Sequence, residues 1–405
     1  MKIWRLAFRY ILRNRRRSLI TILAMAFSLA ILVIYIALVD GMVRDTHVNA
    51  VMLEMGQVQV HAPGYLNTKS IYRRIEHPEA LLDAYRAMGC HASARLFASG
   101  LCAKGASSAG VLLRGLDPSA EAGTTRMARH MLEGHWLAEG GDADVVLGKR
   151  LALTLSAHPG DTVVIVAQAA DGSLANEIFT VRGVLKSVNE NVDRAGFFIT
   201  SGAFRDLMVM PSGVHEIAIT LPPGADLKQT AARIQGLSPG LDVRTWEQLM
   251  PAIKEMIDAM DAFLFITLGI TYIAIAIVTL NAMLMAVFER IREYGLTKAL
   301  GVGPWEVFFQ VMIETLLMAV AAALVGLATG IPLSMWLQTH GIDMSGFIQG
   351  ATLSGVAIDL VWRAWLTPRV VIWPLVFLFL FSLLAALYPA VKAARLDPVR
   401  ALHHS

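Results

Sequence analysis

The stretches whose residue types could support catalysis each lack a necessary partner. "VVLGKR" holds the Gly-Lys pair of a phosphate-binding loop, but Arg150 stands where Ser or Thr is needed and no glycine lies five residues before Gly148. "GASSAG" misses the Gly-x-Ser-x-Gly spacing of a nucleophile by one residue. The histidines form no His-Glu-x-x-His pattern, and two cysteines cannot complete a Cys-rich zinc site. We therefore expect a chain that is not an enzyme and has no metal or cofactor of its own.

A charged stretch between two apolar segments is more informative. Residues 289–303 read "ERIREYGLTKALGVG", in which Ile291, Gly295 and Ala299 recur at helical spacing among charged neighbours. Glycines near its end favour termination of the helix, and Pro304 suits the first position of the next one. The pattern predicts a short amphipathic helix that can bind a partner protein.

The composition places this stretch in a membrane protein. Of the 405 residues 55% are hydrophobic and 17% are charged, and the mean hydropathy is +0.54, outside the usual range of soluble domains. The net charge of +3 is too small to indicate binding to nucleic acid. The positions of the basic residues along the chain are therefore more informative than the net charge.

Four apolar runs are long enough to cross a hydrocarbon core of about 30 Å, which takes roughly 20 helical residues. They predict transmembrane helices at 19–39, 263–288, 304–333 and 370–391. The first run exceeds the apolar length of a signal peptide, about 7 to 15 residues, and lacks a small-x-small cleavage site. We interpret it as a retained anchor.

Basic residues predict the orientation of these helices. They gather in 1–18, in the connection 289–303 and in the tail 392–405. By the positive-inside rule both termini and the connection are cytoplasmic, which leaves 40–262 and 334–369 outside. The segment 1–18 also has apolar and basic faces at helical spacing, as in an amphipathic helix on the membrane surface. The same bases can equally serve as a topology signal alone.

The large outer segment alternates strand-like and helix-like patterns. It predicts two α+β subdomains, the middle one inserted into the first. The fold class is thus an α-helical membrane protein with four transmembrane helices and a large α+β extracytoplasmic domain between helices 1 and 2. Cys90 and Cys102 lie twelve residues apart in this domain, either as a disulfide or as two separate buried thiols.

Three separated motifs resemble the FtsX-like, MacB-type family of ABC transporter permeases. "REYGLTKALGV" is similar to the family signature Arg-Glu-Ile-Gly-Leu-x-Arg/Lys-Ala-Leu-Gly, the coupling helix that docks into the ATPase subunit. "LAFRYILRNRRRSLIT" and "YPAVKAARLDPVRAL" resemble the family's entry and ending, and the layout of spans agrees. Tyr294 and Thr297 depart from the signature, which implies a fit to a particular ATPase. The resemblance implies these docking residues: Glu289, Arg292, Glu293, Tyr294, Gly295, Leu296, Lys298, Ala299, Leu300 and Gly301.

Within the family, "VLLRGLDPSAE" and "TWEQLMPAI" look like the LolC and LolE permeases, which release lipoproteins from the inner membrane. The resemblance implies a multi-pass protein of the bacterial inner membrane that transmits motion from two copies of a separate ATPase, where ATP and Mg are bound. It further implies a second permease subunit, identical or different, membrane lipid, and a lipoprotein with its periplasmic carrier. The alternatives are adaptor-linked export of a small molecule or peptide, and ATP-driven regulation of a periplasmic cell-wall enzyme.

Polar and small residues inside the spans suggest further contacts. Glu314 lies about 15 Å along its helix from Pro304 and should face protein or water, because an acid in lipid is costly. We expect either a structural contact with Asn281 or Thr315, or a conformational latch. Small residues spaced four apart predict close packing within the bundle, or a dimer contact; they are Ala26 and Ala30, Gly326 and Gly330, and Ser382 and Ala386.

The outer ends of two spans are candidate walls for a lipidic substrate. If acyl chains enter between paired permeases, the outer half of the first span near Val39 would face them. Met256 and Met260, which precede the second span, would line the other wall, although methionines more often provide adaptable packing.

Overall fold

The structure is a computed structural model that divides into two compact units. It describes residue 13 and residues 15–343, 352–353, 356–357 and 361–397. An α+β domain comprises Asp45–Glu255 with the short strands at 352–353 and 356–357, and a membrane unit comprises the other described residues. Most of the amphipathic helix expected at 1–18 and the last positions of the C-terminal motif lie outside the described residues.

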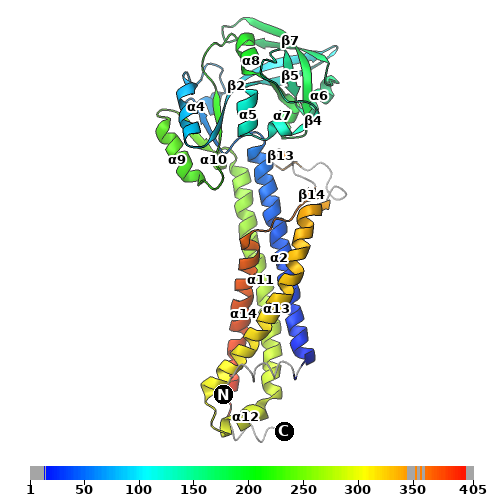
Figure 1. Cartoon of the computed structure of the whole chain (residues 1–405), viewed down its shortest axis with the longest axis vertical. Coiled ribbons are helices and arrows are strands. Elements are labelled where there is room, and N and C mark those ends of the chain that lie inside the picture. Colours follow the sequence, from blue (N-terminus) through cyan, green and yellow to red (C-terminus); the bar gives the residue numbers. More distant parts are fainter. Residues whose placement is uncertain (1–12, 14, 344–351, 354–355, 358–360, 398–405) are drawn as a thin grey trace. The chain divides into compact units, whose positions relative to one another are not determined.

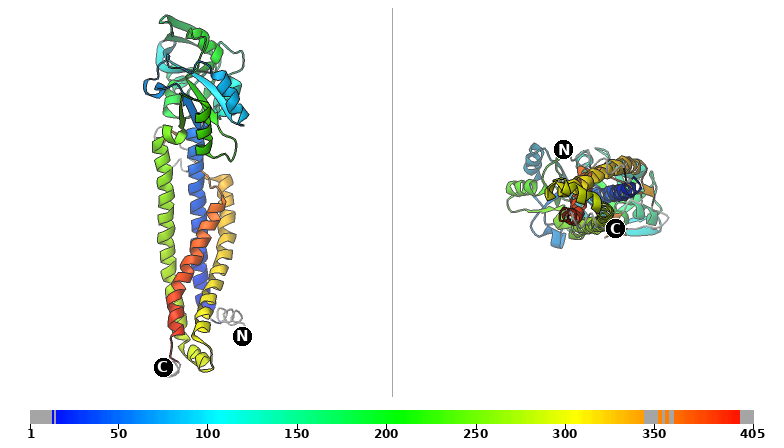
Figure 2. Two further views of the ribbon diagram at one scale, coloured as in Figure 1. Left: turned by 90° about the vertical axis from the view of Figure 1, so that its left-hand side faces the viewer. Right: turned by 90° about the horizontal axis from the view of Figure 1, so that it is seen from below.

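Four helices in the described residues are long and apolar enough to cross a membrane. They are α2 (Arg15–His47), α11 (Pro251–Glu289), α13 (Pro304–His340) and α14 (Pro368–Ala394). Two views at right angles show them running side by side (Figure 1, Figure 2). Each contains one predicted span and extends beyond it, because helix formation does not stop where hydropathy falls. Three of them begin at a proline, a residue suited to the first helical turn.

The small residues of α2 and α13 meet each other. A Cβ added to Gly326 would lie 2.8 Å from the carbonyl oxygen of Ala26, and one added to Gly330 would lie 3.1 Å from the Cα of Ala30. The two helices therefore approach as closely as their backbones allow, the arrangement expected of small-xxx-small motifs. The predicted packing within one bundle accounts for both motifs.

A cluster of polar side chains ties three helices together where α14 begins. The hydroxyl of Thr367 donates to Asp40 of α2 at 2.7 Å. The guanidinium of Arg369 lies 3.3 Å from Asp40 and 2.6 Å from Asp261 of α11. One arginine of α14 thus holds carboxylates of both α2 and α11.

The described part of the α+β domain has a ten-stranded sheet, a separate pair of short strands at 352–353 and 356–357, and a set of short helices. The strands of the large sheet are β1 (Val58–His61), β2 (His91–Lys104), β3 (Ser107–Leu116), β4 (Met131–Gly134), β5 (Asp144–Leu147), β6 (Thr162–Gln168), β7 (Leu174–Leu185), β8 (Gly196–Thr200), β9 (Glu216–Thr220) and β10 (Asp242–Thr245). The helices include the π-helical turn η1 (Val48–Met52), α4 (Pro78–Ala87), α5 (Pro118–Thr124), α6 (Lys149–Leu155), α7 (Glu190–Ala195), α8 (Ser201–Leu207) and α9 (Leu227–Leu237). The other short helices are α3 (Tyr65–Thr68), η2 (Met127–Arg129) and α10 (Trp246–Leu249).

Strand pairing confirms the two predicted subdomains. The open subdomain has the antiparallel order β10-β1-β9-β2, with α4 and α9 packed against it. The closed subdomain is a circuit in which β2, β3, β8, β5, β7 and β6 pair in turn and β6 returns to β2. Its strands β3 to β8 fall in the sequence between β2 and β9, as an insertion requires. The long strand β2 belongs to both subdomains.

The two cysteines lie at opposite ends of β2. Cys90 directly precedes the strand and Cys102 is near its end. Twelve residues of straight strand span roughly 40 Å, whereas a disulfide holds its Cα atoms within about 7 Å. Both thiols are free and buried, and burial raises the pKa of Cys102 to about 12. The structure thus decides between the two alternatives in favour of separate thiols.

Candidate docking site on α12

The charged connection forms the helix α12 (Ile291–Ala299) between α11 and α13. Leu300 caps its C-terminal end, and Gly301 follows with φ +95, a conformation that favours glycine. Pro304 then occupies the first turn of α13, as the sequence predicts. The helix is nine residues long, and short connections join it to α11 at one end and to α13 at the other.

One face of α12 is buried against the membrane helices. Tyr294, only 4% exposed, packs in a cluster with Met283 of α11, Val307 of α13 and Ala390 of α14. Ile291 and Gly295 are buried on the same face. Tyr294, expected to adjust the fit to an ATPase at the surface, instead anchors α12 to the bundle.

Two of the predicted docking charges bind within the chain. The Nζ of Lys298 donates to the carbonyl oxygens of Ala394 at 2.8 Å and Leu396 at 2.6 Å, and so caps the end of α14. The carboxylate of Glu293 forms an ion pair with Arg13. The hydroxyl of Thr297 donates to the carbonyl of Glu293 in its own helix. These residues position α12, and a role in direct docking is not needed to explain them.

The opposite face of α12 is exposed. Leu296 is 54% exposed and Leu300 is 80% exposed, large values for leucines beside a membrane bundle. Arg292 and Ala299 are exposed as well, and Glu289 is exposed at the end of α11. We call Arg292, Leu296, Ala299 and Leu300 the outward face. It combines an apolar centre with a charge, which suits a protein partner better than solvent.

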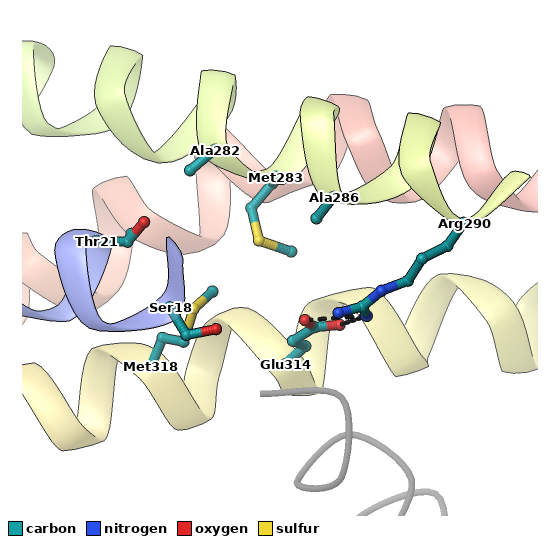
Figure 3. A pocket seen from close by; sticks show the side chains of 8 residues that line it. All are labelled: Ser18, Thr21, Ala282, Met283, Ala286, Arg290, Glu314 and Met318. Carbon is teal, nitrogen blue, oxygen red and sulfur yellow. Dashed lines mark hydrogen bonds and ion pairs between the residues drawn. The ribbon is translucent and has the colours of Figure 1, made fainter. Parts of the chain in front are cut away.

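A buried ion pair holds the junction between α11 and α12. Nη1 of Arg290 lies 3.3 Å from each carboxylate oxygen of Glu314, and both residues are 3% exposed. Figure 3 shows the two charged groups pointing toward each other from neighbouring helices. They form one wall of a small pocket, whose lining residues are Ser18, Thr21, Ala282, Met283, Ala286, Arg290, Glu314 and Met318. The arginine supplies the compensating charge that an acid within a span needs.

Sequence reasoning missed this partner of Glu314. Asn281, the expected contact, is exposed on α11, and the hydroxyl of Thr315 donates to Val311 in its own helix. By sequence alone, Arg290 belongs with the other basic residues of the connection 289–303. The available signal was an acid well inside one apolar run together with a base just beyond the end of the preceding run.

The candidate substrate-lining residues lie on two helices of the membrane unit. Val39 of α2 is partly buried against the core of the bundle. Met256 and Met260 are partly buried in the first turns of α11. Their role in substrate contact stays a proposal.

Family models match most of the chain. A MacB-like periplasmic core domain matches residues 18–237, and an FtsX-like permease C-terminal domain matches residues 265–398. The first match includes α2 and nearly all of the α+β domain, and the second includes α12 and the helices on both sides of it. The gap between the two matches contains the end of the α+β domain and the start of α11.

Three relatives are similar over parts of the chain. The ABC transporter permease MJ1507 of Methanocaldococcus jannaschii is 23% identical over 67% of this chain and 64% of its own length. The lipoprotein-releasing system transmembrane protein LolC of Xylella fastidiosa is 24% identical over 72% of this chain and 73% of its own. The macrolide export ATP-binding/permease protein MacB of Escherichia coli is 28% identical over 47% of this chain and 28% of its own. The chain thus spans less than two thirds of the first and last of these relatives.

The geometry of the ion pair predicts the effect of breaking it. Glu314→Leu leaves Arg290 buried without its carboxylate, so we expect the free energy of unfolding to fall by about 3 to 5 kcal/mol. The double variant Arg290→Met/Glu314→Leu removes both charges and should recover most of this loss. Unfolding titrations of the detergent-solubilised protein measure both. Equal destabilisation in the single and double variants would contradict the pairing.

Proposed function

The chain belongs to the ABC transporter permeases that join a MacB-like periplasmic core domain to an FtsX-like permease domain, and we propose that it couples ATP hydrolysis by a separate ATPase to release of a lipoprotein or other lipidic substrate from the inner membrane. In this proposal ATP and Mg bind to two copies of the ATPase and the permease works as a homodimer or heterodimer. Both termini and α12 face the cytoplasm, and the α+β domain lies outside.

The division of α12 into a held face and an exposed face carries this proposal. The Arg290–Glu314 pair, buried Tyr294 and the Lys298 cap fasten the helix to α11, α13 and α14. A force on the outward face is therefore passed to three membrane helices at once, and cannot be absorbed by rotation of a loose loop. This is the mechanical property that coupling to an ATPase requires.

The choice of a lipidic substrate rests on similarity and on the lining residues. The alignment with LolC, a lipoprotein-releasing system transmembrane protein, extends over 72% of this chain, and this similarity supports the proposal of a lipidic substrate. Val39, Met256 and Met260 offer partly buried apolar surface on α2 and α11 for acyl chains. Regulation of a cell-wall enzyme would need the same motion but no lipid contact.

The ion pair suits a latch as well as a structural tie. As a structural tie it is needed only for stability, so the double variant Arg290→Met/Glu314→Leu would keep ATP hydrolysis by the complex coupled to transport. As a latch it must break and re-form, and the double variant would then be stable but uncoupled.

We expect charges on the outward face to prevent docking. Leu296→Asp and Leu300→Asp place carboxylates in the centre of the proposed contact, where an unpaired buried charge is costly. Each should lower co-purification of the ATPase at least about tenfold, since the penalty exceeds 1.4 kcal/mol. Leu153→Asp is the matched control, because Leu153 is 69% exposed on α6 of the α+β domain.

Normal co-purification of the ATPase with both α12 variants would contradict the docking assignment. Loss with Leu153→Asp as well would indicate a general effect of adding charge. The thermal unfolding of all three variants should match that of the wild type, because the replaced leucines are exposed.

The substrate is tested by crosslinking from the candidate walls. A photo-reactive residue at Val39 or Met256 of the assembled transporter in membranes should trap a lipoprotein, identified by mass spectrometry. The same group at Leu153 is the control and should trap none. Trapping of neither a lipoprotein nor another lipidic substrate at either position, or equal trapping at Leu153, would contradict the proposed substrate class.

A further inference from the structure

The chain enters the α+β domain through the π-helical turn η1, and Glu54 follows almost directly. π-helical turns often occur at functional sites, where the helix adjusts to an extra residue. The backbone N–H of Arg126 donates to the carbonyl of Met52 at 2.9 Å, so this segment is bound into the domain from its first residues. The contacts that connect this segment to both subdomains are made by Glu54.

Three side chains from three different segments converge on Glu54. One carboxylate oxygen forms an ion pair with Arg114 of β3, and the other accepts a hydrogen bond from the amide of Asn189. The backbone carbonyl of Glu54 accepts from the guanidinium of Arg95 of β2. The side chain is 18% exposed and the Arg114 side chain is 8% exposed, so these contacts are largely shielded from water. These hydrogen bonds are strong because at least one partner in each carries a charge.

The backbone contact connects Glu54 to the open subdomain. Arg95 is buried and its guanidinium lies 2.6 Å from Glu121 of α5 and 2.8 Å from Glu216 of β9. Burial raises the pKa of Glu216, but the hydrogen bond with His61 of β1 and the charge of Arg95 together outweigh it and hold the pKa at about 2. Arg95 is therefore fixed to β9 and α5 by ionised carboxylates.

The side-chain contacts connect Glu54 to the closed subdomain. Asn189 is the N-cap of α7, since its Oδ1 accepts from the N–H of Val192 at 2.9 Å while its amide donates to Glu54. Helix α7 leads directly into β8. The guanidinium of Arg114 also lies 5.2 Å above the ring of Phe198 in β8. Both side-chain partners of Glu54 thus reach the same strand.

We propose that Glu54 is the positioning residue that passes a displacement of α2 to both subdomains, through its backbone to the open one and through its carboxylate to the closed one. The inference rests on the proposed function, because ATP hydrolysis displaces α2 only if the chain is a coupled permease. The two routes are separable, since a side-chain substitution affects the carboxylate and leaves the backbone carbonyl in place.

A pair of substitutions tests the side-chain route at constant net charge. Asn189→Asp keeps an N-cap acceptor for α7 but sets a carboxylate against that of Glu54. Adding Glu54→Gln places an amide donor opposite the new carboxylate and keeps an oxygen for Arg114. The double variant therefore exchanges donor and acceptor and restores the wild-type charge. Glu190→Gln is the matched control, because neighbouring Glu190 is half-exposed and pairs with Arg194 at the surface.

The measurement is hydrogen–deuterium exchange of the full-length permease with its ATPase in nanodiscs, with and without a non-hydrolysable ATP analogue. In the wild type we expect the nucleotide to change exchange in η1, in β2 and β9, and in α7 and β8. In Asn189→Asp the change in α7 and β8 should fall about fivefold or more, and that in β2 and β9 should persist. The double variant should recover the change in α7 and β8, and Glu190→Gln should keep it.

The possible results separate this inference from the proposed function. A full nucleotide response of α7 and β8 in Asn189→Asp, or no recovery in the double variant, overturns the role of Glu54 alone. A lower melting temperature with an unchanged nucleotide response also overturns it, because it marks a purely structural contact. Absence of any nucleotide response in the wild type with ATPase bound overturns the coupling function, and the inference with it.

Discussion

Burying a charge in a membrane-spanning helix costs free energy unless a counter-charge lies beside it, and the placement of α12 follows from how Glu314 meets this constraint. Arg290, which directly follows α11 and caps the start of α12, provides the counter-charge. The same contact fixes the point at which the chain turns into α12 and therefore which face of that helix is exposed. Tyr294 and Lys298 then complete the attachment. The contacts of the buried face of α12 with α11, α13 and α14 therefore determine which residues form the outward face.

Features that depend on local pattern could be read from the sequence. The four spans follow from hydropathy, the end of α12 from Gly301 and the start of α13 from Pro304. The β2–β3 hairpin follows from two apolar runs joined by a short turn, and its register runs from Arg95 paired with Leu116 to Lys104 paired with Ser107. These signals succeed because each element is specified by residues within a few positions of one another.

Features that depend on contacts between distant segments could not be read from the sequence. The family signature places Tyr294, Lys298 and Leu296 together, yet the first two face the bundle and the third faces outward. With nine residues and mixed composition, α12 has too weak an apolar stripe to show which side is buried. Likewise, nothing local marks β2 as one long strand shared by two subdomains, so the sequence does not show how far apart Cys90 and Cys102 lie.

Where the chain enters the α+β domain, a short segment is held by buried charged contacts, as α12 is. A short helical segment is followed by a charged residue whose contacts diverge to two subdomains, and buried ionised pairs such as Arg95 with Glu216 keep those contacts in place.

The most direct measurement is the mobility of a spin label at Leu300 in the otherwise native, reconstituted permease. Cys90 and Cys102 are buried and free, and burial raises the pKa of both thiols, so they should react slowly and leave the new cysteine as the labelled position. The account predicts that the label becomes immobilised when the ATPase binds, whereas a label at Leu153 does not change. An ATPase that binds without altering the mobility of the label at position 300 would contradict docking on the outward face of α12.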